Sequence, residues 1–192
     1  MANSNRFNAQ TRPYPRHKEF EAQLRSSNSK WFAEKKFTVN NRIPYLLEKW
    51  EDWPDNIILP EVAQFIQNER IERQNNKEGF PLHKYIHHGL SSQAMLFNLI
   101  GPLIIQDDFS LIQSAFEKLG IIWPEEKATV RFEQENRSIF NEDSGQPTSI
   151  DLVIQGKDNK HSLFIESKLV EHEFGGCSVF SAGDCNGCNP AK

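Results

Sequence analysis

The sequence predicts an α/β protein in which helices occupy most of the first 120 residues and strands follow them. Helical spacing of apolar residues recurs up to about residue 119, whereas strand-like alternation dominates from residue 128 onward. A chain of 192 residues is long enough for one domain with a hydrophobic core. We therefore expect a mixed sheet flanked by helices, with a helical N-terminal extension, and with strands at 129–135, 149–155 and 162–169.

The N-terminal region contains several candidate helices. Helical patterns recur in four stretches before residue 80, namely 17–27, 29–37, 46–53 and 61–73. Pro60 suits the first position of the last of these helices, because the backbone N–H that proline lacks is not needed there. The polar stretch 75–79 interrupts the pattern. The sequence thus predicts a helical, basic region over residues 1–80 and a sheet-containing core with a cysteine-containing tail over residues 81–192.

Two more helices are expected before the strands begin. Residues 90–105 are predominantly apolar, and Ser91 or Ser92 is a candidate N-cap. Residues 109–119 show a second helical pattern, which Gly120 is expected to end.

The composition favours a cytoplasmic protein. No apolar run approaches the ~20 residues of a membrane span, and the N-terminus lacks the charged-then-hydrophobic pattern of a secretion signal. Three cysteines, an odd number, argue against a disulfide framework. We therefore expect no membrane association.

The charge is distributed unevenly along the chain. Residues 1–50 contain ten Lys or Arg against four Glu, a net charge of +6, whereas the remaining residues contain 12 basic and 22 acidic residues, a net charge of −10. Aromatic residues are interleaved with the N-terminal basic ones: Tyr14, Phe20, Trp31 and Phe32. Such a segment could contact a nucleic-acid backbone, or it could be an ordinary solvated surface.

The most informative residues lie in the last two predicted strands. Asp151 occurs early in Thr148-Ser-Ile-Asp-Leu-Val-Ile154, and Glu166 and Lys168 occur late in Ser162-Leu-Phe-Ile-Glu-Ser-Lys-Leu-Val170. Side chains alternate faces along a strand, so Glu166 and Lys168 are expected on one side of the sheet. A hairpin would bring Asp151 to them. Nearby carboxylates repel each other unless a proton or cation lies between them, and Mg²⁺ prefers oxygen ligands. The alternative is a structural ion pair at a strand end.

Gly145-Gln-Pro-Thr-Ser-Ile-Asp151 followed by Ile165-Glu-Ser-Lys168 resembles the signature of the PD-(D/E)XK nuclease superfamily, which has the restriction-endonuclease-like fold. The resemblance implies that Asp151 and Glu166 bind Mg²⁺ or Mn²⁺ and that Lys168 is the catalytic lysine. The backbone carbonyl of Ser167 is a candidate further ligand. The departure from the pattern is Ile150, which stands where the signature has proline.

The preceding strand supplies another acidic group. In Thr129-Val-Arg-Phe-Glu-Gln-Glu135, Glu133 and Glu135 share a face, so either could join the metal site. We select Glu133 as the candidate ligand.

A second stretch resembles a bacterial defence-associated subgroup of restriction-endonuclease-like proteins. It consists of His87-His-Gly-Leu-Ser-Ser-Gln-Ala followed by Phe97-Asn-Leu-Ile-Gly-Pro102. Gln93 could contact a metal-bound water or a phosphate there, or it could link structural elements. We retain Gln93 as a candidate catalytic residue.

The C-terminal tail contains a weak metal-binding pattern. Cys177, Cys185 and Cys188, with His172 as a fourth ligand, could form a Cys₃His zinc site. The alternative is a glycine-rich loop with reduced thiols. Only 24 residues follow Lys168, whereas the fold that the resemblance implies continues with a helix and a strand. We therefore expect either that part of the core is missing or that the sheet is completed in another way, for example by a partner.

These patterns predict a metal-dependent nuclease that hydrolyses phosphodiester bonds, with DNA as the expected substrate. The first alternative is a non-catalytic module of the same fold that binds nucleic acid or a partner. The second is a small structural protein stabilised by zinc. A homodimer or a complex with a partner subunit is compatible with the nuclease and with the non-catalytic module.

Overall fold

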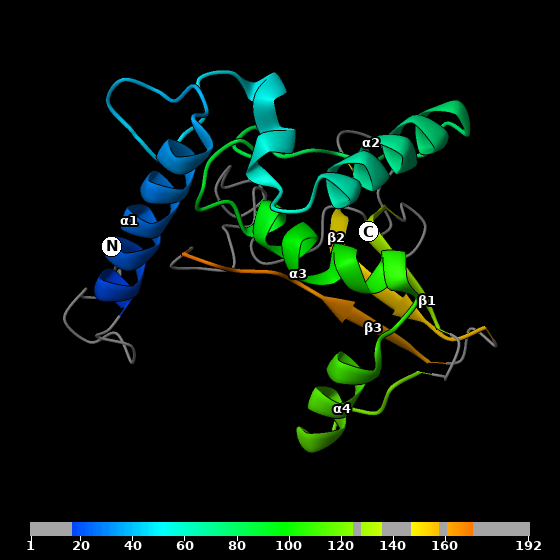
Figure 1. Ribbon diagram of the computed structural model, residues 1–192. Helices are drawn as coiled ribbons and strands as arrows, with labels where there is room; N and C mark the ends of the chain where they lie inside the picture. Colours follow the sequence, from blue (N-terminus) through cyan, green and yellow to red (C-terminus); the bar gives the residue numbers. More distant parts are fainter. Residues whose placement is uncertain (1–16, 125–127, 136–146, 158–160, 171–192) are drawn as a thin grey trace, which may run out of the picture.

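The computed structural model describes residues 17–124, 128–135, 147–157 and 161–170 (Figure 1). Helices come first and strands last, which confirms the predicted α/β class. The helices are α1 (His17–Lys35), the 3₁₀ helix η2 (Trp50–Asn56), α2 (Pro60–Asn75), α3 (Ser92–Gln106) and α4 (Ser110–Lys118). The strands are β1 (Thr129–Glu135), β2 (Ser149–Gln155) and β3 (Ser162–Ile165).

The sheet differs from the predicted mixed sheet, because the three described strands are all antiparallel and follow the chain order β1-β2-β3. Phe132 pairs with Leu152, and Leu152 in turn pairs with Ile165. The reason is the short connection between β2 and β3, which runs only from Gln155 to Ser162. A parallel pair needs a crossover of a dozen or more residues.

Strand β3 is shorter than predicted and ends at Ile165 rather than near residue 169. The physical reason lies in β2. The backbone N–H of Ser167 donates to Oδ2 of Asp151 at 2.6 Å. A side chain therefore takes the place of the ladder partner, and residues 166–170 leave the sheet. In Figure 1 this orange stretch runs from the sheet toward α1.

Local sequence signals account for the helix ends. Residues 17–27 and 29–37, predicted as two helices, form the single helix α1. Ser91 is the N-cap of α3, and its Oγ accepts from the N–H of Ala94 at 3.2 Å. Gly120 has φ +74° after α4, and the Gly120 and Ile121 N–H groups donate to Glu117 and Phe116. This is the Schellman arrangement that a C-terminal glycine permits.

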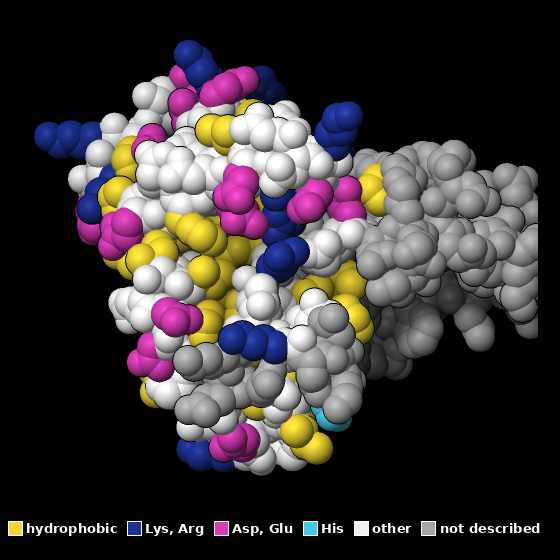
Figure 2. All heavy atoms as spheres, turned by 90° about the vertical axis from the view of Figure 1, so that its right-hand side faces the viewer, with side chains coloured by type: hydrophobic (Ala, Val, Ile, Leu, Met, Phe, Trp, Pro, Cys, Tyr) yellow, Lys and Arg dark blue, Asp and Glu magenta, His cyan; other side chains and the backbone are white. Residues whose placement is uncertain are grey.

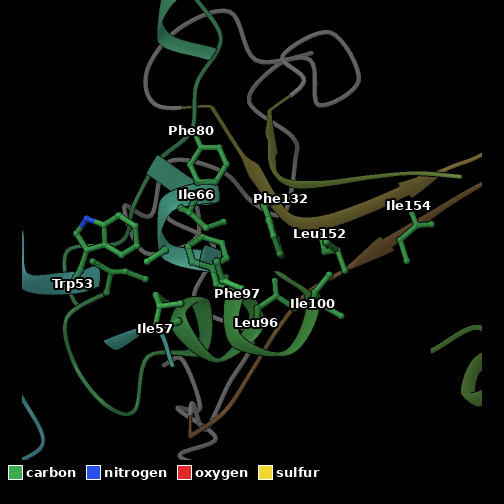
Figure 3. Packing of buried hydrophobic residues seen from close by; sticks show 14 of the residues in the cluster. Trp53, Ile57, Ile66, Phe80, Leu96, Phe97, Ile100, Phe132, Leu152 and Ile154 are labelled. Atoms are coloured by element: carbon green, nitrogen blue, oxygen red, sulfur yellow. The ribbon is translucent and has the colours of Figure 1, made fainter. Parts of the chain in front are cut away.

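One hydrophobic cluster joins the helices to the sheet (Figure 3). Phe97 of α3 lies between Phe80 and Phe132, with ring centroids 6.1 and 4.9 Å away. Trp53 and Ile66 contribute from before residue 80 and Leu152 from the sheet. Residues on both sides of residue 80 therefore share this core, and the division of the chain at that position stays a prediction.

Helices α2 and α3 approach each other closely at one glycine. A Cβ added at Gly101 of α3 would overlap Cγ1 of Val62 in α2. Glycine therefore sets the separation of these two helices.

The surface carries exposed hydrophobic side chains, among them Leu99, Leu111 and Ile122. Figure 2 shows one face on which hydrophobic side chains lie among acidic and basic ones. No single helix within the described ranges is long and apolar enough to cross a membrane. Helices α3 and α4 taken together reach the required length and apolar composition, but they are bent by 120° relative to each other.

Candidate functional site

Asp151 holds the chain that follows β3. It lies in β2 and is partly buried, and its Oδ2 accepts the Ser167 N–H at 2.6 Å. The Ser167 hydroxyl donates to the carbonyl of Ser92 at 3.4 Å, next to the N-terminus of α3. The stretch that carries Glu166 and Lys168 is thus tied both to the sheet and to α3.

Glu166 and Lys168 form an ion pair. Nζ of Lys168 lies 2.6 Å from Oε1 of Glu166, which agrees with the expectation that they share a side. The expectation that the third strand would carry them is wrong, because they follow the end of β3, and the Glu166 and Lys168 side chains are 44% and 29% exposed. The cause is the early end of β3.

The buried carboxylate of the site is Glu133, which is 4% exposed. In β1 it takes the position facing Asp151, between the pairs Phe132–Leu152 and Gln134–Ile150. Its Oε1 accepts from Nε2 of Gln93 at 2.7 Å, and its Oε2 accepts from the Ser149 hydroxyl at 2.6 Å. Three elements, β1, β2 and α3, therefore meet at this carboxylate.

The electrostatics of Glu133 follow from that environment. Burial raises its pKa from the usual value of 4.5 to about 7. The hydrogen bonds from Ser149 and Gln93 lower the pKa, and the negative charges of Asp151 and Glu166 raise it. Glu133 is thus electrostatically coupled to both predicted metal ligands.

The backbone of Glu133 is unusual and is held by a buried arginine. Its φ is +48°, in the left-handed region that non-glycine residues rarely adopt. Nη1 of Arg73 donates to the Glu133 carbonyl at 3.0 Å, and Nε of Arg73 lies 2.9 Å from Glu69. The Arg73 guanidinium also lies 4.9 Å from the centre of the Phe80 ring. Arg73 is 5% exposed, so it fixes Glu133 from inside the protein.

A cavity of about 970 Å³ opens onto these groups. One wall contains most of the predicted site residues, namely Gln93, Glu133, Asp151 and Lys168, together with Ser149. Glu166 and Ser167 are not among the lining residues but adjoin Lys168 in sequence. The structure therefore brings the predicted residues of three segments together.

A second part of the lining, here called the second wall, comes from α1 and from two loops. It contains Glu21 and Arg25 of α1, Tyr45, and the stretch from His83 to Tyr85 with His88. Burial lowers the pKa of His88, and the nearby charges of His87 and Arg25 lower it further. Nδ1 of His88 accepts the Leu90 N–H at 3.1 Å, which requires this nitrogen to be unprotonated.

The donor set fits a hard divalent cation in its chemistry. Within residues 17–170, the described parts contain no group of three or more His, Cys, Asp or Glu side chains arranged to hold a metal ion. Mg²⁺ at phosphate-processing sites commonly takes one or two carboxylates and completes its shell with water and substrate oxygens. Asp151 and Glu166, which both raise the pKa of Glu133, could supply those carboxylates.

The candidate zinc ligands lie outside the described ranges: Cys177, Cys185, Cys188 and His172. The sequence patterns did not identify three residues that the structure places at the site, namely Arg73, Ser149 and Tyr85. For Arg73 a signal was available, because an arginine on the apolar side of a predicted helix indicates a buried polar contact. Phe32 belongs to the segment that was expected either to contact a nucleic-acid backbone or to be a solvated surface, and it is fully buried, so its ring can do neither.

The fold and the site thus define an α/β protein with an antiparallel sheet and, at one end of that sheet, a cavity lined by carboxylates, a lysine and a glutamine. A family described as "Restriction Endonuclease associating with ARP" matches residues 21–189. Because the match covers most of the chain, the protein belongs to this restriction endonuclease family. Comparison with curated proteins and with solved structures found no match.

Proposed function

We propose that this protein is a Mg²⁺- or Mn²⁺-dependent nuclease of the PD-(D/E)XK type that hydrolyses phosphodiester bonds in DNA. The observation that carries the proposal is the cavity wall on which Gln93, Glu133, Asp151 and Lys168 converge. Membership of a restriction endonuclease family supports both the reaction and the substrate.

Asp151 and Glu166 are the proposed metal ligands, with the Ser167 carbonyl and Glu133 as further oxygen donors. The ion pair between Glu166 and Lys168 and the hydrogen bond from Ser167 to Asp151 hold these groups close together. A bound divalent cation would supply acidity to a water molecule and stabilise charge on the phosphate.

The residues of the chain have separate roles in this proposal. Lys168 orients or deprotonates the attacking water and stabilises negative charge as it develops. Gln93 assists by fixing the Glu133 carboxylate through its 2.7 Å hydrogen bond. Glu133, with its pKa near 7, can hold or release a proton at Oε1 or Oε2 in neutral solution.

The setting of the reaction is also part of the proposal. We place the protein in the cytoplasm, with a role in bacterial defence. The family description names association with ARP, which supports a complex with a partner subunit rather than action by the chain alone.

The test is cleavage of supercoiled plasmid and of single-stranded DNA with Mg²⁺ or Mn²⁺. The wild type is compared with Lys168→Ala and with Lys118→Ala, which removes an exposed lysine on α4 that does not line the cavity. We expect metal-dependent cleavage by the wild type and Lys118→Ala, and a loss of at least about 100-fold in Lys168→Ala. Cleavage retained in Lys168→Ala would refute the assignment. Absence of cleavage by the wild type would favour a non-catalytic module that binds nucleic acid or a partner.

A further inference from the structure

The second wall of the cavity has no role in the hydrolysis described above. It consists of Glu21 and Arg25 from α1, Tyr45, and the turn from His83 to Tyr85. Its chemistry differs from that of the first wall, because it combines aromatic rings with cationic side chains, and its acid, Glu21, forms an ion pair with Arg25.

Rings and cations are paired on this wall. The guanidinium of Arg25 lies 5.7 Å from the centre of the Tyr45 ring, and Nζ of Lys84 lies 4.8 Å from the centre of the Tyr85 ring. Tyr85 is 53% exposed although it borders the cavity. Sites for single-stranded nucleic acids use this combination, because bases stack on aromatic rings while cations contact the backbone.

The wall is held in place by backbone hydrogen bonds. The Ile86 N–H donates to the His83 carbonyl at 3.0 Å, and the His88 N–H donates to the Tyr85 carbonyl at 2.9 Å. The Gly89 N–H donates to the Tyr45 carbonyl at 2.8 Å, which joins the two loops. The backbone that carries the rings is thus ordered before any ligand binds, which reduces the entropic cost of binding.

One residue connects the two walls. Oε1 of Gln93 accepts the His83 N–H at 2.8 Å, while Nε2 donates to the Pro81 carbonyl at 2.9 Å and to Glu133 at 2.7 Å. The turn that carries Tyr85 is therefore fixed directly to the carboxylate of the proposed catalytic site.

We propose that this second wall binds an unstacked nucleotide of the DNA strand that is cleaved, with its base against Tyr85 and its flanking phosphates near Arg25 and Lys84. The inference rests on the proposed function and adds the form of the substrate: a strand that contains at least one unpaired nucleotide at the cleavage site. The volume of about 970 Å³ agrees with this form. Pockets of roughly 300–1,000 Å³ bury drug-sized ligands; a single nucleotide is of that size, whereas a stretch of duplex is larger.

Binding without turnover tests the proposal. Single-stranded DNA with one 2-aminopurine and a blunt duplex of the same sequence are titrated with the full chain in the Lys168→Ala background, in Ca²⁺. Tyr85→Ala and Tyr85→Phe are then added to that background. The matched control is Phe20→Ala, which removes an aromatic ring that is 44% exposed on α1 and does not line the cavity.

We expect the single strand to bind about ten-fold more tightly than the duplex, with quenching of 2-aminopurine as the base stacks. Tyr85→Ala should weaken single-strand binding by about ten-fold and abolish the quenching, because stacking on one ring contributes on this scale. Tyr85→Phe and Phe20→Ala should bind as the parent does.

Equal affinity of Tyr85→Ala and its parent for the single strand would overturn the inference, as would equal affinity for duplex and single strand, or no binding of either. Its failure is distinguishable from failure of the proposed function. Metal-dependent cleavage that is insensitive to Tyr85→Ala would refute the nucleotide site alone. Tyr85-dependent binding by a wild type that never cleaves would refute the nuclease and keep the nucleotide site.

Discussion

Gln93 at the start of α3 donates from Nε2 to Oε1 of the buried Glu133 at 2.7 Å, and the same side chain also bonds the backbone of Pro81 and His83. A single amide therefore orients the only carboxylate of the site that is shielded from solvent within the described residues. Its loss should affect both the carboxylate and the adjoining turn.

Gln93→Ala is expected to lower the free energy of unfolding by about 1–3 kcal/mol, because buried hydrogen-bonding groups lose their partner. Cleavage should fall by about 10- to 100-fold, the usual cost of removing a residue that orients a metal-site ligand. Urea unfolding and plasmid cleavage measure the two effects. Gln113→Ala is the control, since its side chain bonds only Glu117 on the exposed face of α4 among the contacts of the described residues. Equal effects in the two variants would contradict the role of Gln93.

Substitutions of Asp151 separate its charge from its hydrogen bond. Asp151→Asn keeps an oxygen that can accept the Ser167 N–H, whereas Asp151→Ala removes it. Both variants should lose metal-dependent cleavage, but only Asp151→Ala should also lose about 1–2 kcal/mol of unfolding free energy. Mn²⁺ titration, cleavage and urea unfolding together test this. Asp151→Asn with normal Mn²⁺ affinity would exclude Asp151 as a metal ligand.

Glu133 should make stability depend on pH in the absence of metal. Its pKa is about 7 in the folded protein, against 4.5 for an ordinary exposed glutamate. Between these values the folded state holds a proton that the unfolded state has released, so the unfolding free energy falls as pH rises through this window. The contribution is present below pH 4.5, is lost by pH 7, and amounts to roughly 3 kcal/mol.

Glu133→Gln isolates that contribution, because glutamine does not titrate. With chelator present, urea unfolding of both proteins from pH 4.5 to 8 should show the variant gaining about 3 kcal/mol relative to wild type as pH rises. Parallel pH profiles would show that the pKa of Glu133 is not raised.

Arg73→Met should destabilise the protein by about 2–4 kcal/mol, because it removes the buried donor to the Glu133 carbonyl and leaves Glu69 without its partner. Arg70→Met on the same helix is the control. The Arg70 guanidinium lies 5.7 Å from the Trp50 ring, a contact expected to contribute less than about 1 kcal/mol. Chemical denaturation of both variants measures the difference, and a similar loss in each would argue against a special role for Arg73.

The elements with local signals were predictable from the sequence. The cap at Ser91, the start of α2 at Pro60 and the end of α4 at Gly120 each depend on residues within one turn. The three strands also form within the segments predicted for them. Asp151, Gln93 and Lys168 line one cavity.

The remaining features depend on residues far apart in the sequence. Strand β3 ends early because Asp151, 16 positions before Ser167, accepts its N–H. The left-handed backbone of Glu133 is held by Arg73, 60 positions away. No window of local sequence contains either pair, so periodicity alone could not distinguish the buried Glu133 from the exposed Glu166.

The close contact of Gly101 with Val62 bears on how mutational scans of this protein should be interpreted. Helix α2 carries Arg73, which holds the Glu133 backbone, and α3 carries Gln93, which holds its side chain. A bulkier residue at Gly101 would push the two helices apart and move both anchors at once. Loss of activity in such a variant would report a distorted scaffold, and Gly101 should not be mapped as a point of DNA contact on that ground.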